Sequence, residues 1–497
     1  MLIQIERESK IALHTQIRRQ LEELILSGVL PPGARLPSTR ELAVSLGVNR
    51  STVVAAYRQL WSDGLVEGRR GGGTVVAQFE EVKSAPKTQV QPLAWEKQYS
   101  RTVSLLEPEL FSDSASAHEK DIIRLCPGNP PDDLFPVQTL RNLAESISLE
   151  EMSSLRWGTA QGMIDLRRAI SERLVLEGID AAPSQIIIVT CGQQGIYLIA
   201  RALLRPGDVV ATEMPTYLGA QYVFQTCEAR IAAVPVDQDG MRLDILEGVL
   251  KRQHPRLIFV CPTFQNPTTG TMSLEQRKAL VALAHQYQVP ILEYDPYSPF
   301  RYEGRTLPTL RALDTQNHVL HVFGAATMIY PGMRVAWLIM PPRVRQKLVP
   351  LKWIVDTGIG AMGQWAVYRL LGTEPDRLKV LRNRLACRRD AMCDALLTCC
   401  DGLLQWKKPE GGFFIWAQLK EDLLSERVLE EALEEGVRII PGSDFFHEGV
   451  GGERRLRLDF AELSEDQITE GVRRLSVAIR RCAKKYRRRK SGSWLKK

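Results

Sequence analysis

Cys-x-x-Cys pairs, apolar runs long enough to span a membrane and an apolar leader are all lacking from this 497-residue sequence. Its nine cysteines are scattered and form no Cys-x-x-Cys pair, so the sequence indicates neither a zinc site nor a disulfide framework, and a reducing compartment fits. Two long charge-free runs, 181–200 and 315–333, are interrupted by proline, glutamine and asparagine and predict no membrane span. The N-terminus, MLIQIERESK, carries charges where a signal peptide would be apolar. We therefore expect a cytoplasmic protein with no membrane partner and no bound metal.

Lysine is also missing from one long stretch, since none occurs between Lys278 and Lys347. Over the whole chain, 65 basic residues against 58 acidic ones give a formal charge of +7, a mild excess that permits an acidic partner without requiring one. With 44% hydrophobic residues the chain can bury a large core, and its length predicts about three domains, or one small and one large domain.

The first 78 residues have the pattern of three short helices followed by a hairpin. Apolar residues recur at helical spacing over 13–26, and a second helix begins at Ser38, whose partner Glu41 completes a Ser-x-x-Glu capping box. Gly47 ends this helix, and Asn49 is the expected N-cap of a third one. Two short helices joined by a tight turn are typical of a helix-turn-helix.

Basic and hydroxyl side chains lie at the two places of this unit that would meet DNA. The third helix begins Arg50-Ser51-Thr52, which offers a cation, hydroxyls and free backbone N–H groups to phosphates and base edges. The hairpin tip, 69–73, is basic and glycine-rich, as expected of a wing that lies along the minor groove or the DNA backbone. We therefore predict a double-stranded DNA operator as a partner.

The segment 13–76 resembles the winged helix-turn-helix of GntR-type transcriptional regulators over its whole length. The resemblance implies a DNA-binding domain at residues 1–78. Val54 stands where some members of the group place another arginine in the reading helix. The DNA-binding residues that we expect are Arg35, Ser38, Arg40, Asn49, Arg50, Ser51, Thr52, Arg69, Arg70 and Gly72.

A change of composition separates this domain from the rest of the chain. Residues 79–120 are polar, with three prolines and a serine-rich patch, and have the character of a linker. After the linker, apolar β-branched runs alternate with amphipathic helical stretches, and the runs are 186–189, 209–211, 257–260 and 291–292. This alternation predicts an α/β domain with a mostly parallel sheet, covered on both faces, whose ligands bind beyond the carboxyl ends of the strands.

Polar residues follow these strands. The loop 190–195 opens a helix whose backbone N–H groups suit an anion, and Tyr217, Asn266 and Tyr297 each come shortly after a strand. Taken singly, such residues are often caps or turn residues. Together and in this order they resemble the fold-type I aminotransferases that use pyridoxal phosphate, over residues 121–484, including a small C-terminal α/β subdomain. Residues 485–497 form a basic tail that we expect to be a solvated end.

The resemblance assigns roles to several residues. In that family the residue matching Tyr217 stacks on the pyridine ring, those matching Asn266 and Tyr297 bond the ring hydroxyl, and the counterpart of Arg334 clamps the phosphate. Arg457 matches the arginine that grips an amino acid's carboxylate, a bidentate task that its planar guanidinium suits. The resemblance implies pyridoxal phosphate as the cofactor and an effector site made of Gly192, Gln193, Tyr217, Asn266, Asp295, Tyr297, Thr327, Arg334 and Arg457.

The sequence departs from that family where the cofactor is held. Counting back from the Pro-Gly turn at 331–332, the position of the Schiff-base lysine is Thr327, and a threonine can neither form an imine nor act as an amine base. The aspartate that pairs with the pyridinium nitrogen should stand three residues before Tyr297, where the sequence has Tyr294. Asp295 comes one position late, and on an extended segment that slip turns its side chain to the other face. Pyridoxal phosphate cannot be bound covalently through Thr327, so we expect no transaminase activity.

A winged helix fused to this fold resembles the MocR branch of the GntR regulators, over nearly the whole chain. Three interpretations stay open. The first is a regulator whose aminotransferase-like domain binds an effector noncovalently, either a pyridoxal phosphate derivative, a cofactor–amino acid adduct or another amino compound. The second is a regulator whose large domain serves for dimerisation alone, and the third is a transaminase with an appended DNA-binding domain. We favour the first, as a homodimer, because family members pair through their aminotransferase-like domains.

Overall fold

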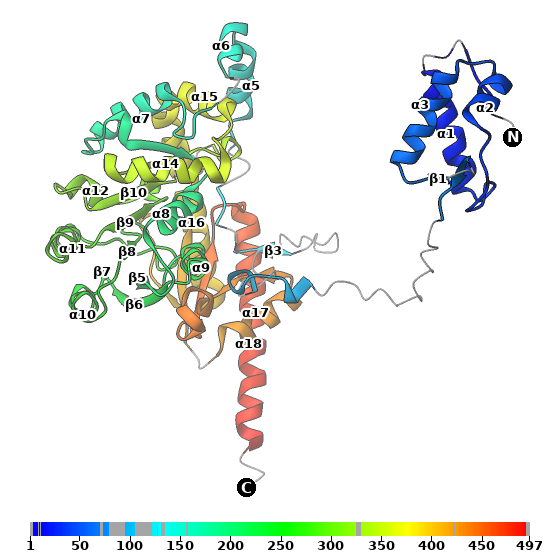
Figure 1. The fold of residues 1–497 in the computed structure, drawn as a ribbon. Coiled ribbons are helices and arrows are strands. Elements are labelled where there is room, and N and C mark those ends of the chain that lie inside the picture. Colours follow the sequence, from blue (N-terminus) through cyan, green and yellow to red (C-terminus); the bar gives the residue numbers. More distant parts are fainter. Residues whose placement is uncertain are drawn as a thin grey trace. The chain divides into compact units, whose positions relative to one another are not determined.

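The chain folds into two compact units, Met1–Gln98 and Tyr99–Lys497 (Figure 1). The computed structural model describes residues 3–7, 9, 11–69, 73–78, 95–104, 122–126, 128–130, 135–155, 158–324, 330–420 and 423–493. The boundary between the units falls inside the linker that the sequence predicts at 79–120. Within that linker the described residues form a short 3-10 helix, Trp95–Lys97, and α4 (Arg101–Ser104), which packs against α9 (Leu218–Thr226) of the second unit.

The first unit is a bundle of three helices with a two-stranded hairpin. Ile17 and Leu21 of the first helix pack with Val53 and Leu60 of the third, and all four side chains are fully buried. This core leaves the first turn of the third helix in solvent. The elements are α1 (Leu13–Leu26), α2 (Thr39–Leu46), α3 (Arg50–Ser62), β1 (Val66–Arg69) and β2 (Gly73–Val76).

Side-chain caps fix where the second and third helices begin. The Ser38 hydroxyl accepts a hydrogen bond from the Glu41 N–H at 3.2 Å, and the Glu41 carboxylate accepts one from the Ser38 N–H at 2.8 Å. Asn49 Oδ1 accepts from the Ser51 N–H at 3.1 Å, and Gly47 ends α2 in the left-handed conformation. The three helices, both caps and the hairpin that the sequence predicts are confirmed.

The second unit is built on a mixed sheet of eight strands in the order β4-β11-β10-β9-β8-β5-β6-β7. The strands β6, β5, β8, β9 and β10 run parallel to one another, whereas β11 is antiparallel to both of its neighbours and β7 is antiparallel to β6. All four runs predicted as strands lie in this sheet. The bounds are β4 (Ile186–Val189), β5 (Val209–Met214), β6 (Arg230–Asp237), β7 (Gly240–Met241), β8 (Leu257–Val260), β9 (Ile291–Asp295), β10 (Val319–Phe323) and β11 (Ala336–Ile339).

Helices cover both faces of this sheet, as the apolar runs predict. Because side chains alternate along a strand, Ile186 and Ile188 of β4 pack with α7, whereas Ile187 and Val189 pack with α8. In Figure 1 the helices flank the sheet on its two sides. The helices of this part are α5 (Val137–Ser146), α6 (Leu149–Ser154), α7 (Ile164–Leu176), α8 (Gly192–Leu203), α9 (Leu218–Thr226), α10 (Leu243–Gln253), α11 (Leu274–Tyr287), α12 (Leu310–Leu313), α14 (Pro342–Asp356) and α15 (Ala361–Leu370).

The small C-terminal α/β subdomain is present, with its own sheet and core. Its four-stranded sheet has the order β12-β13-β16-β15, and a separate short pair joins β14 (Val437–Arg438) to β3 (Ile123–Arg124). The strands are β12 (Leu404–Trp406), β13 (Phe414–Leu419), β15 (Ile440–Pro441) and β16 (Arg455–Asp459), and the helices are α16 (Glu374–Cys400), α17 (Ser425–Glu434) and α18 (Glu465–Ser493).

The last helix runs into the basic tail that the sequence predicts at 485–497. Helix α18 continues to Ser493, so the first part of the predicted tail is helical, and α18 extends away from the body in Figure 1. Arg481 and Lys485 pair with Glu435 and Glu431 of the α17 region, which ties the base of the extension to the subdomain. Among the described residues, no helix combines the length and apolarity that a membrane crossing needs.

A buried ion pair holds strand β9 to β10. Glu293 and His321 are both fully buried, and a Glu293 oxygen lies 2.9 Å from His321 Nδ1. The carboxylate also accepts hydrogen bonds from the backbone N–H groups of Leu310 and Arg311, at 2.7 and 2.9 Å. Burial raises the pKa of Glu293, but the charge of His321 and these hydrogen bonds outweigh burial and lower it. Burial lowers the pKa of His321, and Glu293 outweighs that effect and raises it.

We predict that Glu293→Gln lowers the free energy of unfolding by about 3 kcal/mol at pH 6, because it leaves a buried imidazolium without its partner. Protonated His321 adds to the free energy of unfolding. This stabilisation is fully present below the pKa of a free histidine and is lost as the pH rises through the raised pKa of His321 in the folded protein. The contribution of Glu293 is lost as the pH falls through its lowered one. Thermal unfolding followed by circular dichroism measures the effect. Glu448→Gln, at a side chain that is 78% exposed, is the control; equal midpoints for both variants would contradict the prediction.

Candidate functional site

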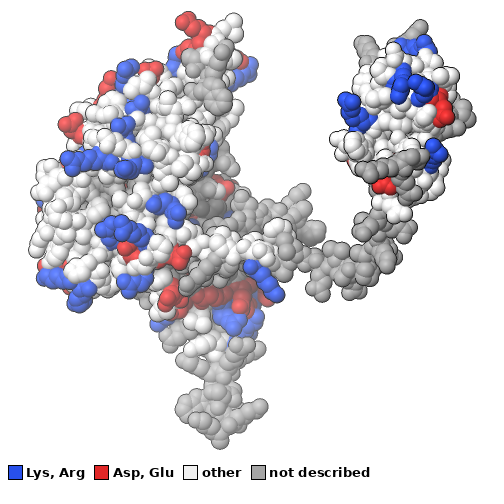
Figure 2. Space-filling view, in the orientation of Figure 1, with Lys and Arg blue, Asp and Glu red and all other residues white. Residues whose placement is uncertain are grey.

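The first turn of α3 is an exposed polar surface. Arg50 and Ser51 are exposed, and Asn49 bonds both the backbone N–H and the hydroxyl of Ser51. Arg50 Nε lies 3.4 Å from the hydroxyl of Thr39, so the starts of α2 and α3 adjoin. Arg40, in the first turn of α2, is also exposed. The structure therefore brings together the helix residues that the sequence predicts for DNA contact, and Figure 2 shows mostly basic charge on the visible face of this unit.

The wing belongs only in part to the described residues, because its tip at 70–72 falls outside them. Arg69 ends β1 opposite Gly73 of β2, and Arg35 forms a bridge to Val75 of the same hairpin. A Cβ atom on Gly73 would lie 3.3 Å from Arg35 Nε, so this arginine sits against the base of the tip. Of the predicted residues, Arg70 and Gly72 lie outside the described residues.

The second candidate site lies at the carboxyl ends of the parallel strands, as expected for this kind of sheet. Asn266, after β8, donates a hydrogen bond to the Tyr297 hydroxyl at 3.4 Å. Arg457 of β16 donates to Asn266 Oδ1 at 3.0 Å and to the carbonyl of Cys126 at 2.7 Å. Three of the predicted effector residues, which are far apart in the sequence, therefore form one hydrogen-bonded chain. We call Asn266, Tyr297, Arg457, Tyr217 and Gln193 the candidate pocket.

Arg457 is an incompletely satisfied cation. Its guanidinium lies 4.1 Å from the centre of the Phe414 ring and 5.0 Å from that of Phe445, and its Nε is buried without a hydrogen-bond partner. Burial lowers its pKa. Asp459 follows two residues later on the same strand, and burial raises the pKa of its carboxyl group to about 7. A buried guanidinium with an unused N–H is suited to a ligand that brings a hydrogen-bond acceptor.

The start of helix α8 supplies the other side of the pocket. Gln193 Nε2 donates to the Gly219 carbonyl at 2.7 Å, and Gln193 Oε1 is buried without a partner. Gln194 accepts from the Thr190 N–H at 2.9 Å and donates to Asp356 at 2.7 Å. These bonds fix the loop that the sequence predicts as an anion cradle.

An aromatic stack lies against this loop. The ring centres of Tyr217 and Tyr294 are 5.3 Å apart with an interplanar angle of 28°, and Phe259 continues the stack on Tyr294 at 6.4 Å. A Cβ atom on Gly192 would lie 2.5 Å from the Tyr294 ring. The Tyr294 ring therefore lies between the expected stacking residue, Tyr217, and the first turn of α8.

Two of the predicted residues, Asp295 and Arg334, do not join the pocket in the described structure. The Asp295 carboxylate accepts hydrogen bonds from the Ser298 hydroxyl at 2.7 Å and its N–H at 3.1 Å, which corrects its assignment to the effector site. The physical reason is the alternation of side chains on β9, which turns Asp295 to the face opposite Tyr294. Arg334 is exposed, in a left-handed conformation after a 3-10 turn. Thr327 lies outside the described residues.

Sequence reasoning missed several partners. Asp459 could have been found, because it stands two residues after Arg457 and therefore on the same face of strand β16. The Cys126 carbonyl and Asp356 lie 331 and 162 residues from Arg457 and Gln194, and no local pattern marks such pairs.

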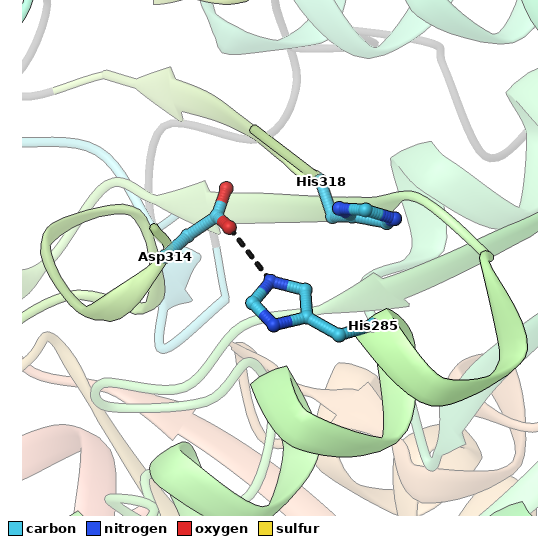
Figure 3. A group of neighbouring side chains, drawn as sticks. All are labelled: His285, Asp314 and His318. Carbon is cyan, nitrogen blue, oxygen red and sulfur yellow. Dashed lines mark hydrogen bonds and ion pairs between the residues drawn. The ribbon is translucent and has the colours of Figure 1, made fainter. Parts of the chain in front are cut away.

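A cluster at the opposite, amino end of β10 consists of His285, Asp314 and His318 (Figure 3). His285 Nε2 lies 2.8 Å from Asp314 Oδ1. The same carboxylate also accepts from two backbone N–H groups of the turn that leads into β10 and from Arg311 at 3.2 Å. Because both oxygens are used and a guanidinium stands beside them, the cluster clamps the turn rather than offering a cation a free ligand.

The chain belongs to the aminotransferase class I and II family, which matches residues 120–475, and residues 13–76 match the bacterial regulatory proteins of the gntR family. The uncharacterized HTH-type transcriptional regulator YisV of Bacillus subtilis is 32% identical over 482 residues, 96% of this chain and 98% of the relative. The probable rhizopine catabolism regulatory protein MocR of Rhizobium meliloti is 28% identical over 490 residues, 96% of each chain. The identification as a MocR-type regulator, with its two-domain fold, is confirmed.

Solved aminotransferases share the fold of the second unit. Kynurenine aminotransferase of Pyrococcus horikoshii is 32% identical, with a TM-score of 0.72 over 78% of this chain and 98% of its own. The α-aminoadipate aminotransferase LysN of Thermus thermophilus, solved with N-(5'-phosphopyridoxyl)-L-leucine, is 31% identical with a TM-score of 0.72 over 79% and 99%. The fold therefore relates this unit to pyridoxal phosphate.

The described residues fit that cofactor unevenly. Asn266, Tyr297 and Arg457 would suit polar groups of a ligand, and the first turn of α8 would suit an anion. On the face of β9 that meets Tyr217, however, the side chain is the phenol of Tyr294, whereas a pyridinium nitrogen needs a carboxylate there. The pocket fits the polar end of a small ligand better than it fits the cofactor ring.

We predict that Asp459→Asn makes the stability of the protein less dependent on pH. The folded pKa of about 7 lies above the unperturbed 3.8, so the folded state binds this proton more tightly, and stability falls as the pH rises from about 4 to about 7. The variant does not titrate and keeps the hydrogen bond from the Ala461 N–H. Midpoints of thermal unfolding at pH 5 and pH 8 should therefore differ less in the variant than in the wild type. Parallel pH profiles would contradict this, and Asp165→Asn, at an exposed side chain, is the control.

Proposed function

We propose that this protein is a DNA-binding transcriptional regulator whose aminotransferase-like unit binds a small effector noncovalently and forms the dimer. The observation that carries the proposal is the exposed first turn of α3, where Arg50 and Ser51 follow the Asn49 cap and adjoin the start of α2. Side chains and free N–H groups at such a helix start are suited to phosphates and base edges in a major groove.

The effector role is supported by the pocket. Arg457 has a buried Nε and Gln193 a buried Oε1 without partners, and a ligand that brings one acceptor and one donor would satisfy both. Binding without an imine is supported by the sequence, which has no lysine between Lys278 and Lys347, the stretch that holds the expected position of the Schiff base. A transaminase is disfavoured for the same reason.

The dimer is supported by apolar side chains on α14 and α15. Trp353, Ile354, Val355 and Met362 have exposed fractions of 59, 75, 45 and 49% and lie near one another in sequence around the turn between these helices. Exposed apolar patches of this kind mark protein–protein contacts. Because a symmetric dimer uses the same patch twice, one such surface is enough to join two copies.

A dimer explains how an effector could act on DNA binding. Two winged-helix units bind two half-sites only at one separation. An effector that binds one arrangement of the dimer more tightly than another shifts the population toward it, by no more than its difference in affinity for the two.

We predict that Arg50→Ala weakens operator binding by about 1 to 3 kcal/mol, because it removes a contact to a base edge. The operator is first obtained by selecting DNA from a random-sequence pool with the full-length protein, and binding is then measured by fluorescence anisotropy. Arg141→Ala, at a side chain of the second unit that is 68% exposed, should leave the affinity unchanged. If both variants bind like the wild type, α3 is not the reading helix.

We predict that Ile354→Asp converts the dimer to monomers at micromolar concentration, because each copy would bury an unpaired carboxylate in the interface. Light scattering after size-exclusion chromatography gives the mass. Leu397→Asp, on α16 at an exposed fraction of 61%, should leave the dimer intact. A dimeric Ile354 variant, or a monomeric wild type, would contradict the proposed interface.

A further inference from the structure

Tyr294 occupies a decisive place among the pocket residues. It is the fourth residue of β9, its exposed fraction is 6%, and its ring lies between those of Tyr217 and Phe259. The Tyr294 ring also lies directly against α8. A Cβ atom on Gly192 would lie 2.5 Å from Tyr294 Cε2 and 3.1 Å from its hydroxyl oxygen. The ring is therefore held from both sides and cannot turn away without repacking the stack.

The place that this ring takes is the one a bound pyridoxal ring would need. By the resemblance to fold-type I aminotransferases, Tyr217 would stack on such a ring, the strand position of Tyr294 would face its nitrogen, and the first turn of α8 at Gly192 would hold its phosphate. The Tyr294 side chain already stacks on Tyr217 and contacts that turn. A phenol ring and a pyridine ring have nearly the same size, so the two cannot share this volume.

The chemistry of the position agrees with its shape. A protonated pyridine nitrogen buried in this pocket needs an anionic acceptor. Burial raises the pKa of Tyr294 well above that of a free phenol, so the side chain stays neutral. The two carboxylates that flank it on the strand are both used elsewhere: Glu293 pairs with His321, and Asp295 accepts from the N–H and the hydroxyl of Ser298.

We propose that the Tyr294 side chain fills the cofactor-ring site of this protein, so that neither pyridoxal phosphate nor its adducts with amino acids bind there. The effector of the regulator is then a compound without the phosphopyridine ring, which reaches Arg457 and Gln193 beside a permanently filled ring site. The consequence of this exclusion for regulation rests on the proposed effector role. The exclusion itself does not, because it is tested by ligand binding and not by DNA binding.

The test is a titration of the full-length protein with pyridoxamine 5'-phosphate, which has no aldehyde and cannot form imines with surface lysines. Binding is followed by tryptophan fluorescence and by isothermal titration calorimetry. The wild type and Tyr294→Phe, which keeps the ring, should show no saturable binding up to millimolar ligand. Tyr294→Asp, which removes the ring and supplies the carboxylate, should bind at least about 100-fold more tightly than the wild type.

Tyr294→Ala distinguishes the effect of removing the ring from the effect of adding a carboxylate, because it opens the space without supplying a charge. It should bind more tightly than Tyr294→Phe and less tightly than Tyr294→Asp. One-to-one binding by the wild type at micromolar ligand would overturn the proposal, whatever the variants do. It would also be overturned if the Asp and Ala variants, folded by circular dichroism and still binding the operator, bound no more tightly than the wild type. If the wild type bound no operator DNA, that result would count against the proposed function and not against the exclusion of the cofactor.

Discussion

Strand β9 lies inside the sheet, between β8 and β10, with both faces buried, so each of its last three side chains must suit the environment on its own side. Glu293 and Asp295 point to one face, where His321 and Ser298 neutralise or bond their carboxylates. Tyr294 points to the other, into the stack with Tyr217. The pocket depends on this alternation. Because the aspartate stands at 295 and not at 294, the side chain that faces the pocket is the ring of Tyr294 and not a carboxylate.

Much of the fold could be predicted from local patterns. The capping box of Ser38 and Glu41 and the αL glycine at Gly47 mark helix ends by chemistry that acts within four residues, and such signals are read directly from sequence. The strands β4 and β8 are equally plain because they are unbroken apolar runs, and β5 and β9 each begin with a short apolar run. Strand β6 was missed since its alternating pattern, with exposed and buried residues in turn, is weaker than a run. The helical course of 485–493 was missed because basic composition alone suggests a solvated end.

The candidate site was predictable only as a set of residue types. The order of polar residues after strands indicated Tyr217, Asn266, Tyr297 and Arg457, and three of these share hydrogen bonds in the structure. What the sequence could not supply is the direction of each side chain and the partners it meets across the chain. The unused Nε of Arg457 and the ring of Tyr294 over Gly192 depend on contacts between distant segments, which no local spacing encodes.

The tie between Gln194 and Asp356 gives the pocket a mechanical connection to the outside of the protein. Lys352, fully buried on α14, holds both oxygens of Asp356 at 2.8 and 2.9 Å, so the end of α14 is locked to the first turn of α8. The residues between this lysine and this aspartate are the exposed Trp353, Ile354 and Val355. A single turn of α14 therefore contacts the pocket loop through Asp356 and presents three apolar side chains to solvent.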